Sequence, residues 1–144
     1  MRILFVVAFF ASLAAVCQAQ SSLQAEVLQK QNPVLVGVKN NVALCLKVSV
    51  PENQQIAISE LRFSTKGTSR LSDLKAFRVF STGTRPSFVD SSMVSQTAKV
   101  GKEFAVKEAI MLQKGENYLW VTLELKDKVN LLNRFDVACS SMML

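Results

Sequence analysis

Large aliphatic residues recur at every second position in two segments of this chain, residues 41–50 and residues 117–125. Successive side chains of a β-strand point to opposite faces, so the alternation predicts two strands that each turn one face to a core and the other to water. The residues predicted to face the core are Val42, Leu44, Leu46, Val48 and Val50 in the first segment and Leu119, Val121, Leu123 and Leu125 in the second.

The rest of the sequence predicts further short strands with turn residues between them. We expect strands at residues 34–38, 56–63, 75–81, 93–98, 102–108 and 134–140, a loop at 84–92, and a half-turn of helix within 23–32 that Pro33 ends. This series is typical of an all-β fold. We predict one antiparallel β-sandwich of about 7–8 strands, jelly-roll or immunoglobulin-like, over residues 34–144 after a lead-in at residues 20–33.

The first 19 residues predict a secretory signal peptide. Arg2 supplies a single positive charge before an apolar run over residues 3–16, and the small residues Cys17 and Ala19 follow. The run is short for a bilayer span, so export of a mature chain that starts at Gln20 is favoured over a membrane anchor. We therefore expect the protein in the periplasm, at the cell surface or outside the cell, with no membrane span in the mature chain.

The basic residues of the chain are spread along the sequence rather than gathered into a run. The formal net charge is +6, but nucleic-acid binding needs clustered charge that neutralises neighbouring phosphates together. We therefore expect no nucleic-acid partner, because scattered lysines are more typical of a solvated face that discourages aggregation.

The residue types that catalysis needs are scarce. The chain contains no histidine, which excludes Ser-His-Asp and Cys-His nucleophile systems and most zinc sites. Its acidic residues stand singly, and its five glycines form no phosphate-binding loop. We predict a protein with no catalytic residues, no cofactor and no metal site. For Asp73 the alternatives are a calcium ligand and a turn that its side chain fixes, and the turn is favoured because calcium needs several clustered oxygens.

Cys45 and Cys139 are the two cysteines that follow the predicted signal peptide. An even pair in an oxidising compartment is compatible with a disulfide, which would stabilise the fold by roughly 2–4 kcal/mol. Strand parity argues against it, since Cys45 falls on the polar side of its strand and Cys139 on the apolar side with Phe135 and Val137. A β-bulge would reverse either assignment, so both alternatives stay open.

Three segments carry a family resemblance through their order and spacing: GTSRLSDLKAFRVFSTGT at residues 67–84, KGENYLWVTLEL at 114–125 and RFDVACSS at 134–141. Over about residues 34–141 the chain resembles the N-terminal β-sandwich domain that precedes the propeller of bacterial exo-sialidases, the BNR-repeat neuraminidases. The resemblance implies a secreted or surface protein of a glycan-degrading bacterium. It implies no active site here, because the tyrosine nucleophile, the carboxylates and the arginine cluster of sialidases lie on the propeller, whose Ser-x-Asp-x-Gly-x-Thr-Trp turns are absent from this sequence.

Tyr118 and Trp120 are the candidate contact residues. By strand parity they share the face opposite the aliphatic row, and exposed aromatic rings suit stacking on sugars. The alternative is that a loop or a catalytic domain covers them while neighbours bond to their polar atoms. We therefore expect a secreted, non-catalytic accessory module that binds a glycan, sialylated or another host carbohydrate, or docks with a sialidase catalytic domain. The other possibility is an N-terminal fragment of an exo-α-sialidase that is inactive by itself.

The signal-peptide prediction is tested by the mass of the exported protein. We expect expression in a bacterial host that secretes the chain to yield a protein whose intact mass corresponds to a start at Gln20. Ala19→Lys should block cleavage, because the peptidase needs a small residue at that position, whereas Ser22→Ala should be processed normally. An exported protein that retains Met1 would contradict the prediction.

Overall fold

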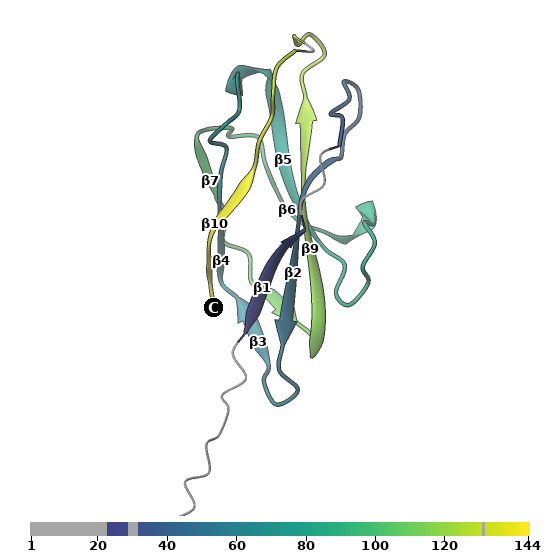
Figure 1. Cartoon of the computed structure of the whole chain (residues 1–144), viewed down its shortest axis with the longest axis vertical. Coiled ribbons are helices and arrows are strands. Elements are labelled where there is room, and N and C mark those ends of the chain that lie inside the picture. The colour runs from purple at the N-terminus through teal and green to yellow at the C-terminus, as the bar shows by residue number, and fades with distance from the viewer. Residues whose placement is uncertain (1–22, 29–31, 131) are drawn as a thin grey trace, which may run out of the picture.

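The structure, a computed structural model, describes residues 23–28, 32–130 and 132–144. The predicted signal peptide, residues 1–19, lies outside the described residues. Within them the chain forms ten β-strands and two single-turn 3-10 helices, with every strand pair antiparallel (Figure 1). The predicted all-β antiparallel fold is confirmed. None of the helical turns in the part of the chain that the structure describes has the length and apolarity of a membrane span.

One layer of the molecule is a five-stranded sheet with the strand order β1-β2-β9-β5-β6. Its strands are β1 (Gln24–Leu28), β2 (Asn41–Val50), β9 (Gly115–Leu125), β5 (Leu74–Ser81) and β6 (Met93–Thr97). The 3-10 turns η1 (Leu71–Asp73) and η2 (Asp90–Ser92) precede β5 and β6.

The opposite layer consists of two smaller sheets, with the orders β10-β4-β7 and β3-β8. Their strands are β10 (Ala138–Met143), β4 (Glu60–Ser64), β7 (Glu103–Val106), β3 (Ile56–Ile58) and β8 (Ile110–Leu112). Figure 1 shows β10, β4 and β7 facing β5 and β9 across the molecule. The two layers make a β-sandwich.

The core lies between the layers and contains the aliphatic rows that the alternation predicted. The inward residues of β2 and β9 are almost fully buried: Leu44, Leu46, Val48, Val50, Leu119, Val121, Leu123 and Leu125. The opposite layer contributes Ile58, Leu61, Phe63, Phe104, Val106, Ile110 and Leu112 to the same cluster. Burial of these side chains supplies the main favourable term of folding, about 1.5–3 kcal/mol for each large one.

A stack of three phenylalanine rings joins the two layers. Phe77 of β5 lies 4.3 Å, centroid to centroid, from Phe104 of β7, and their planes differ by 10°. Phe104 in turn stacks on Phe63 of β4 at 4.9 Å. Because the rings come from both sheets, this stack contributes directly to layer packing.

The prediction of a half-turn of helix within residues 23–32 is wrong. Residues 24–28 form β1, which pairs with β2 from Gln24 opposite Ser49 to Leu28 opposite Cys45. All five residues of β1 are exposed, because the strand lies at the edge of its sheet. An edge strand without a buried face leaves no apolar alternation for sequence reasoning to detect.

The strand predicted at 34–38 is also wrong, because these residues form a turn around Gly37, whose φ is 80°. The buried side chain of Asn41 holds the turn: its Oδ1 accepts from the Leu35 N–H at 2.8 Å, and its Nδ2 donates to the carbonyls of Leu35 and Val38. The left-handed backbone conformation of Gly37 cannot continue a β-strand, so the chain turns at this position.

Three other boundaries differ from the predictions. A bulge between Val42 and Leu44 places Val42 opposite Thr122, on the outer side of the sheet rather than in the core. The strand predicted at 56–63 is divided into β3 and β4 at Ser59, whose N–H donates to the Met143 carbonyl. The last strand begins only at Ala138, because the preceding residues belong to a long loop.

The three-ring stack gives a direct test of the packing. Phe77→Ala removes the fully buried ring that joins β5 to β7, and we expect the free energy of unfolding to fall by about 3–5 kcal/mol. Urea titration followed by the fluorescence of the single tryptophan measures the change. Met111→Ala, at a position 58% exposed on β8, should change it by no more than about 0.5 kcal/mol. Equal effects of the two substitutions would contradict this account of the core.

Candidate functional site

The outer face of the five-stranded sheet, the side turned away from the core, carries the predicted contact residues Tyr118 and Trp120. Both lie on β9, where Trp120 is paired with Cys45 of β2 on one side and Phe80 of β5 on the other. Strand parity thus places them on one face, as the alternation indicated.

Trp120 is only partly exposed, because the loop of residues 82–92 between β5 and β6 lies over it. The indole Nε1–H donates to the Thr82 hydroxyl at 2.9 Å. Phe88 packs edge-on against the indole with 6.0 Å between the centroids, and it packs in the same way on Phe80 at 5.0 Å. The loop therefore occupies part of the surface that a sugar ring would need for stacking.

Tyr118 is 8% exposed, and its hydroxyl belongs to a chain of charged groups. It donates to Glu116 Oε2 at 2.9 Å, and Lys47 bridges Glu116 and Glu26 at 3.2 and 3.3 Å. The hydrogen bond from Tyr118 and the nearby Lys47 ammonium lower the pKa of the Glu116 carboxyl, and the same hydrogen bond raises the pKa of Tyr118. This phenol is held in its protonated form as a donor.

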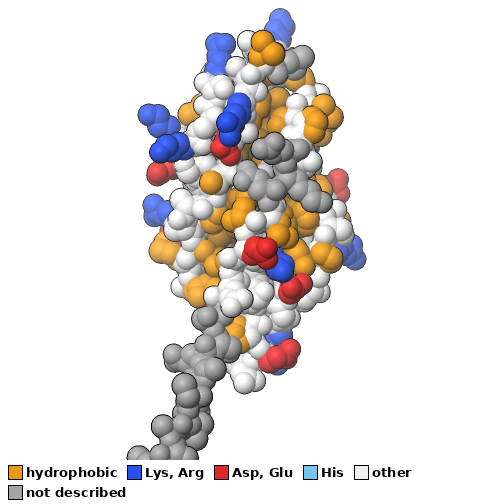
Figure 2. Space-filling model, in the orientation of Figure 1, with side chains coloured by type: hydrophobic (Ala, Val, Ile, Leu, Met, Phe, Trp, Pro, Cys, Tyr) orange, Lys and Arg blue, Asp and Glu red, His pale blue; other side chains and the backbone are white. Residues whose placement is uncertain are grey.

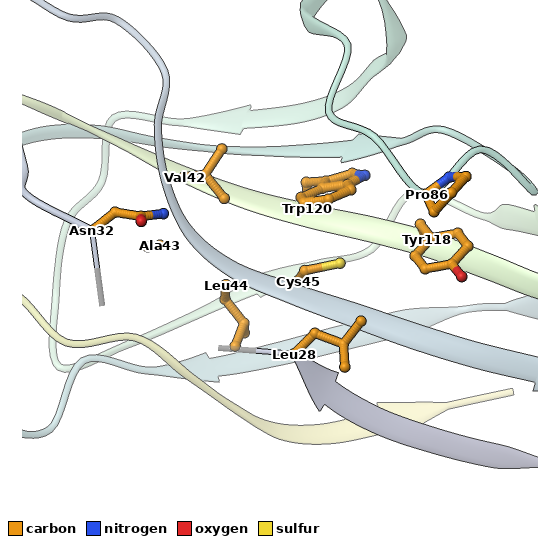
Figure 3. Close-up of a pocket in the computed structure, with 9 residues that line it drawn as sticks. All are labelled: Leu28, Asn32, Val42, Ala43, Leu44, Cys45, Pro86, Tyr118 and Trp120. Atoms are coloured by element: carbon orange, nitrogen blue, oxygen red, sulfur yellow. The ribbon is translucent and has the colours of Figure 1, made fainter. Parts of the chain in front are cut away.

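An apolar pocket of about 390 Å³ opens beside these two rings (Figure 3). The edge strand β1, the bulged part of β2, strand β9 and the loop over them form its walls. We call it the apolar pocket; its lining residues are Leu28, Asn32, Val42, Ala43, Leu44, Cys45, Pro86, Tyr118 and Trp120. Sequence reasoning did not identify Leu28, Val42 and Pro86 as lining residues of the pocket. Leu28 lies on an exposed edge strand, Val42 at a bulge and Pro86 in a loop that is distant in sequence, and none of these positions leaves a local sequence pattern.

The outer face over β5 and β6 is covered by an ion pair. Arg78 of β5 is 4% exposed and contacts Glu124 of β9 through Nη2. Its Nη1 donates to the Lys39 carbonyl at 2.7 Å and its Nε to Gln96 Oε1 at 2.9 Å. Lys75 also pairs with Glu124, at 2.7 Å, and these two cations lower the pKa of the Glu124 carboxyl. The buried charges are paired and hydrogen-bonded, so this part of the face is structural.

Cys45 and Cys139 are free thiols in the structure. Cys45 lies on the outer face, in the apolar pocket, while Cys139 is paired with Phe63 in the opposite layer and packs against the core. Burial raises the pKa of the Cys45 thiol to about 11 and raises the pKa of Cys139 as well. Neither side chain has the electropositive setting of a reactive cysteine.

Asp73 ends η1 and is buried. Its Oδ2 accepts a hydrogen bond from Asn133 Nδ2 at 2.5 Å, and its Oδ1 lies 3.7 Å from Arg70 Nε. The carboxylate thus ties the turn η1 to the distant loop that carries Asn133. Among the described residues no group of three or more histidine, cysteine, aspartate or glutamate side chains is placed to hold a metal ion.

Comparisons with known proteins agree with this fold. The family described as "N-terminal domain of BNR-repeat neuraminidase" matches residues 22–144. A solved structure, the "Hadza microbial sialidase Hz136", is similar with a TM-score of 0.66 and 19% sequence identity. The match covers 81% of this chain and 27% of the sialidase chain, so this chain spans about a quarter of that protein. No curated protein matches.

The two thiols provide a test of the pocket. At pH 8 we expect the Cys45 thiol to react with Ellman's reagent about 100-fold more slowly in the folded protein than in urea, because a pKa near 11 reduces the thiolate fraction by about that factor. The Cys139→Ser variant isolates the Cys45 signal. Protein unfolded without a reductant should titrate both thiols. Loss of both signals would reveal a Cys45–Cys139 disulfide and contradict the structure.

Proposed function

Because this chain belongs to the family of N-terminal domains of BNR-repeat neuraminidases, we propose that it is an exported, non-catalytic accessory module that docks against a sialidase catalytic domain. The observation that carries this proposal is the apolar pocket beside Trp120. Export is supported by the charge and apolar pattern of residues 1–19.

The lining of the pocket suits a protein side chain better than a sugar. A sugar site needs polar groups that converge on the hydroxyls, but the walls here are mainly aliphatic, proline and thiol surface. The indole N–H and the Tyr118 hydroxyl already donate to Thr82 and Glu116. What remains for a ligand is apolar area, which favours an inserted leucine, methionine or aromatic side chain.

The edge strand β1 beside the pocket exposes apolar side chains on both of its faces. Leu28 is 37% exposed and its neighbour on β1, Val27, is 51% exposed. Val27 is paired with Leu46, on the inward side of the sheet, yet the core does not cover it. A partner that covers the pocket would bury Leu28, and one that also wraps around the edge of β1 would reach Val27 on the other face.

The partner class follows from the family. The family consists of N-terminal domains of BNR-repeat neuraminidases, and the similar sialidase has nearly three quarters of its chain outside the matched region. The chain contains no histidine, so Ser-His-Asp and Cys-His nucleophile systems are excluded. The same docking surface would serve a free-standing module and the leading part of a longer sialidase chain.

A charge placed at the rim of the pocket tests the docking. We expect the purified protein to bind the BNR-repeat catalytic domain encoded in the same genome, and Leu28→Lys to weaken that binding about 10-fold or more because it buries an unpaired ammonium. Gln24→Lys is the matched control: it adds the same charge to the same face of β1, four residues away and outside the pocket, and should bind like the wild type. Calorimetric titration measures both.

Three outcomes would count against the proposal: no binding of the catalytic domain by the wild type, equal weakening by the two lysine variants, or release of sialic acid from a fluorogenic sialoside by the protein alone. Thermal unfolding of each variant separates loss of docking from loss of folding. Because Leu28 and Gln24 are both exposed, we expect the three proteins to unfold within a few degrees of one another.

A further inference from the structure

Three loops meet at one end of the sandwich and carry nearly all of the net charge of the chain. Two backbone hydrogen bonds of 2.9 Å join them, from the Thr65 N–H to the Lys102 carbonyl and from the Ser69 N–H to the Arg134 carbonyl. The loops contain seven basic and two acidic residues, which amounts to +5 of the formal net charge of +6. Positive potential is therefore concentrated here although the sequence has no basic run. We call this surface the basic end; its loops are residues 65–70, 98–102 and 126–137.

All seven basic side chains of the basic end are exposed. Figure 2 shows lysine and arginine side chains gathered over the upper part of the molecule, where this end lies. Arg70 and Arg134 each have one carboxylate at 3.7 Å, in Asp73 and Asp136. Charge that is not neutralised within the chain is available to an anionic partner. Among the described residues no ion pair engages the lysines of this end, which are Lys66, Lys99, Lys102, Lys126 and Lys128.

An apolar side chain stands at the tip of the longest of these loops. Leu132 is 93% exposed, and Figure 1 shows the loop after β9 at the upper end of the long axis of the molecule. A turn holds the leucine there: Asn130 Oδ1 accepts from the Leu132 N–H, and the Asn130 carbonyl accepts from the Asn133 N–H, both at 3.0 Å. A single exposed leucine is ordinary on a protein surface, but this one lies between Lys128 and Arg134 in the sequence, within the basic end.

The loop that carries Leu132 is fixed to the neighbouring loop. The Thr68 hydroxyl donates to the Asp136 carbonyl and accepts from the Asp136 N–H, each at 3.0 Å. The bond from Asn133 to buried Asp73 adds a second attachment. A loop held in this way presents its tip without a large ordering cost on binding.

The exposed leucine occupies neither of the two cavities that lie near it. Between the loop 126–137 and residues 32–34 lies a polar cleft of about 750 Å³, lined largely by amide and charged side chains, and Leu132 is not among its lining residues. The apolar pocket does not include it either. The side chain therefore points away from the surfaces of this chain that could bury it and is available to an outside phase.

We propose that the basic end docks on the surface of a lipid bilayer that contains anionic phospholipids, with Leu132 inserted among the headgroups. Two separate properties of this end match such a surface. The exposed cations lie where the phosphates of the bilayer carry negative charge, and the apolar tip reaches the hydrocarbon boundary beneath them. Each lysine or arginine held near an anionic bilayer strengthens binding by about five-fold, so several of them together with one inserted leucine give measurable affinity.

A bilayer fits the basic end better than another macromolecule does. The leucine projects from the convex tip of the molecule, and a fluid headgroup layer admits such a side chain without a preformed pocket. An acidic protein surface would need a cavity shaped for this one residue. A nucleic acid would satisfy the charges through its phosphates but offers its backbone no apolar region for Leu132. This surface goes beyond the docking proposed for the apolar pocket and does not depend on it.

Co-sedimentation with lipid vesicles tests the proposal on the chain that starts at Gln20, which lacks the apolar run of residues 3–16. We expect it to bind phosphatidylcholine vesicles that contain about one third phosphatidylglycerol, and not to bind phosphatidylcholine alone. Binding should weaken as the salt concentration rises from about 0.1 M to 1 M, because the Debye length falls from about 10 Å to 3 Å. Leu132→Asn should weaken binding about 5-fold or more. Met111→Asn, at a position 58% exposed on β8 beside β3 at the lower end of Figure 1, should bind like the wild type.

Two double variants of equal net charge separate the location of the charge from its total. Lys126→Gln with Lys128→Gln removes two charges from the basic end, and we expect the affinity for anionic vesicles to fall about 10-fold or more. Lys107→Gln with Lys114→Gln removes two exposed charges on either side of β8 and should leave the affinity unchanged. Because all four lysines are exposed, thermal unfolding should differ by only a few degrees among these proteins.

Each other result would overturn the proposal. Absence of binding to anionic vesicles, or equal binding to neutral ones, removes the anionic bilayer as the partner. Equal weakening by the two double variants reduces the effect to net charge, and unchanged binding by Leu132→Asn removes the apolar tip. Loss of the BNR-repeat catalytic domain by the Lys126 and Lys128 double variant, with no vesicle binding by the wild type, would assign the basic end to an acidic protein surface. The Leu28→Lys protein should keep its vesicle binding, so the failure of this proposal is distinguishable from the failure of docking.

Discussion

The antiparallel pairing of β2 with β9 organises both faces of the main sheet. On the inner face the pair supplies the aliphatic rows of the core, and on the outer face it places Cys45 beside Trp120. A slip of one residue would exchange these two sets. Buried asparagines stand near both ends of the pair: Asn41 bonds to the carbonyls of Leu35, Val38 and Leu123, and Asn117 bonds to those of Val48, Gln113 and Gly115. Because each amide would lose its partners in another register, these bonds favour the observed one.

The outer face shows how an antiparallel sheet can be covered without a second layer. The loop 82–92 packs Phe88 against Trp120 and Phe80, and the Lys39 carbonyl accepts a hydrogen bond from Arg78. Both covering segments come from connections between strands, so the face is divided into a closed part with paired charges and an open part with apolar walls. The open part keeps apolar area for a partner. The site is therefore determined as much by what the loops leave uncovered as by the aromatic residues of β9.

Sequence reasoning predicted the parts of the fold in which burial alternates along the chain. It identified β2 and β9 with their inward rows, and it placed Tyr118 and Trp120 on the opposite face. It failed at β1, which has no buried face, at Val42, which a bulge turns outward, and at residues 34–38, where Gly37 and the Asn41 amide make a turn. Sequence reasoning could not predict the polar cleft either, because the cleft depends on contacts between segments that are distant in sequence. Asn130 and Arg134 are ordinary loop residues in the sequence, and they become part of one site only because Thr68, Ser69 and Asp73, some sixty residues earlier, hold their loop.

Among the described residues, Asn32 alone lines both the apolar pocket and the polar cleft between residues 32–34 and loop 126–137. The two surfaces are chemically distinct but physically adjacent, and segment 32–34 forms a wall of the cleft. A partner side chain that enters the pocket and displaces Asn32 would also change the shape of the cleft. A ligand in the cleft and a partner in the pocket would then change each other's affinity by the same factor.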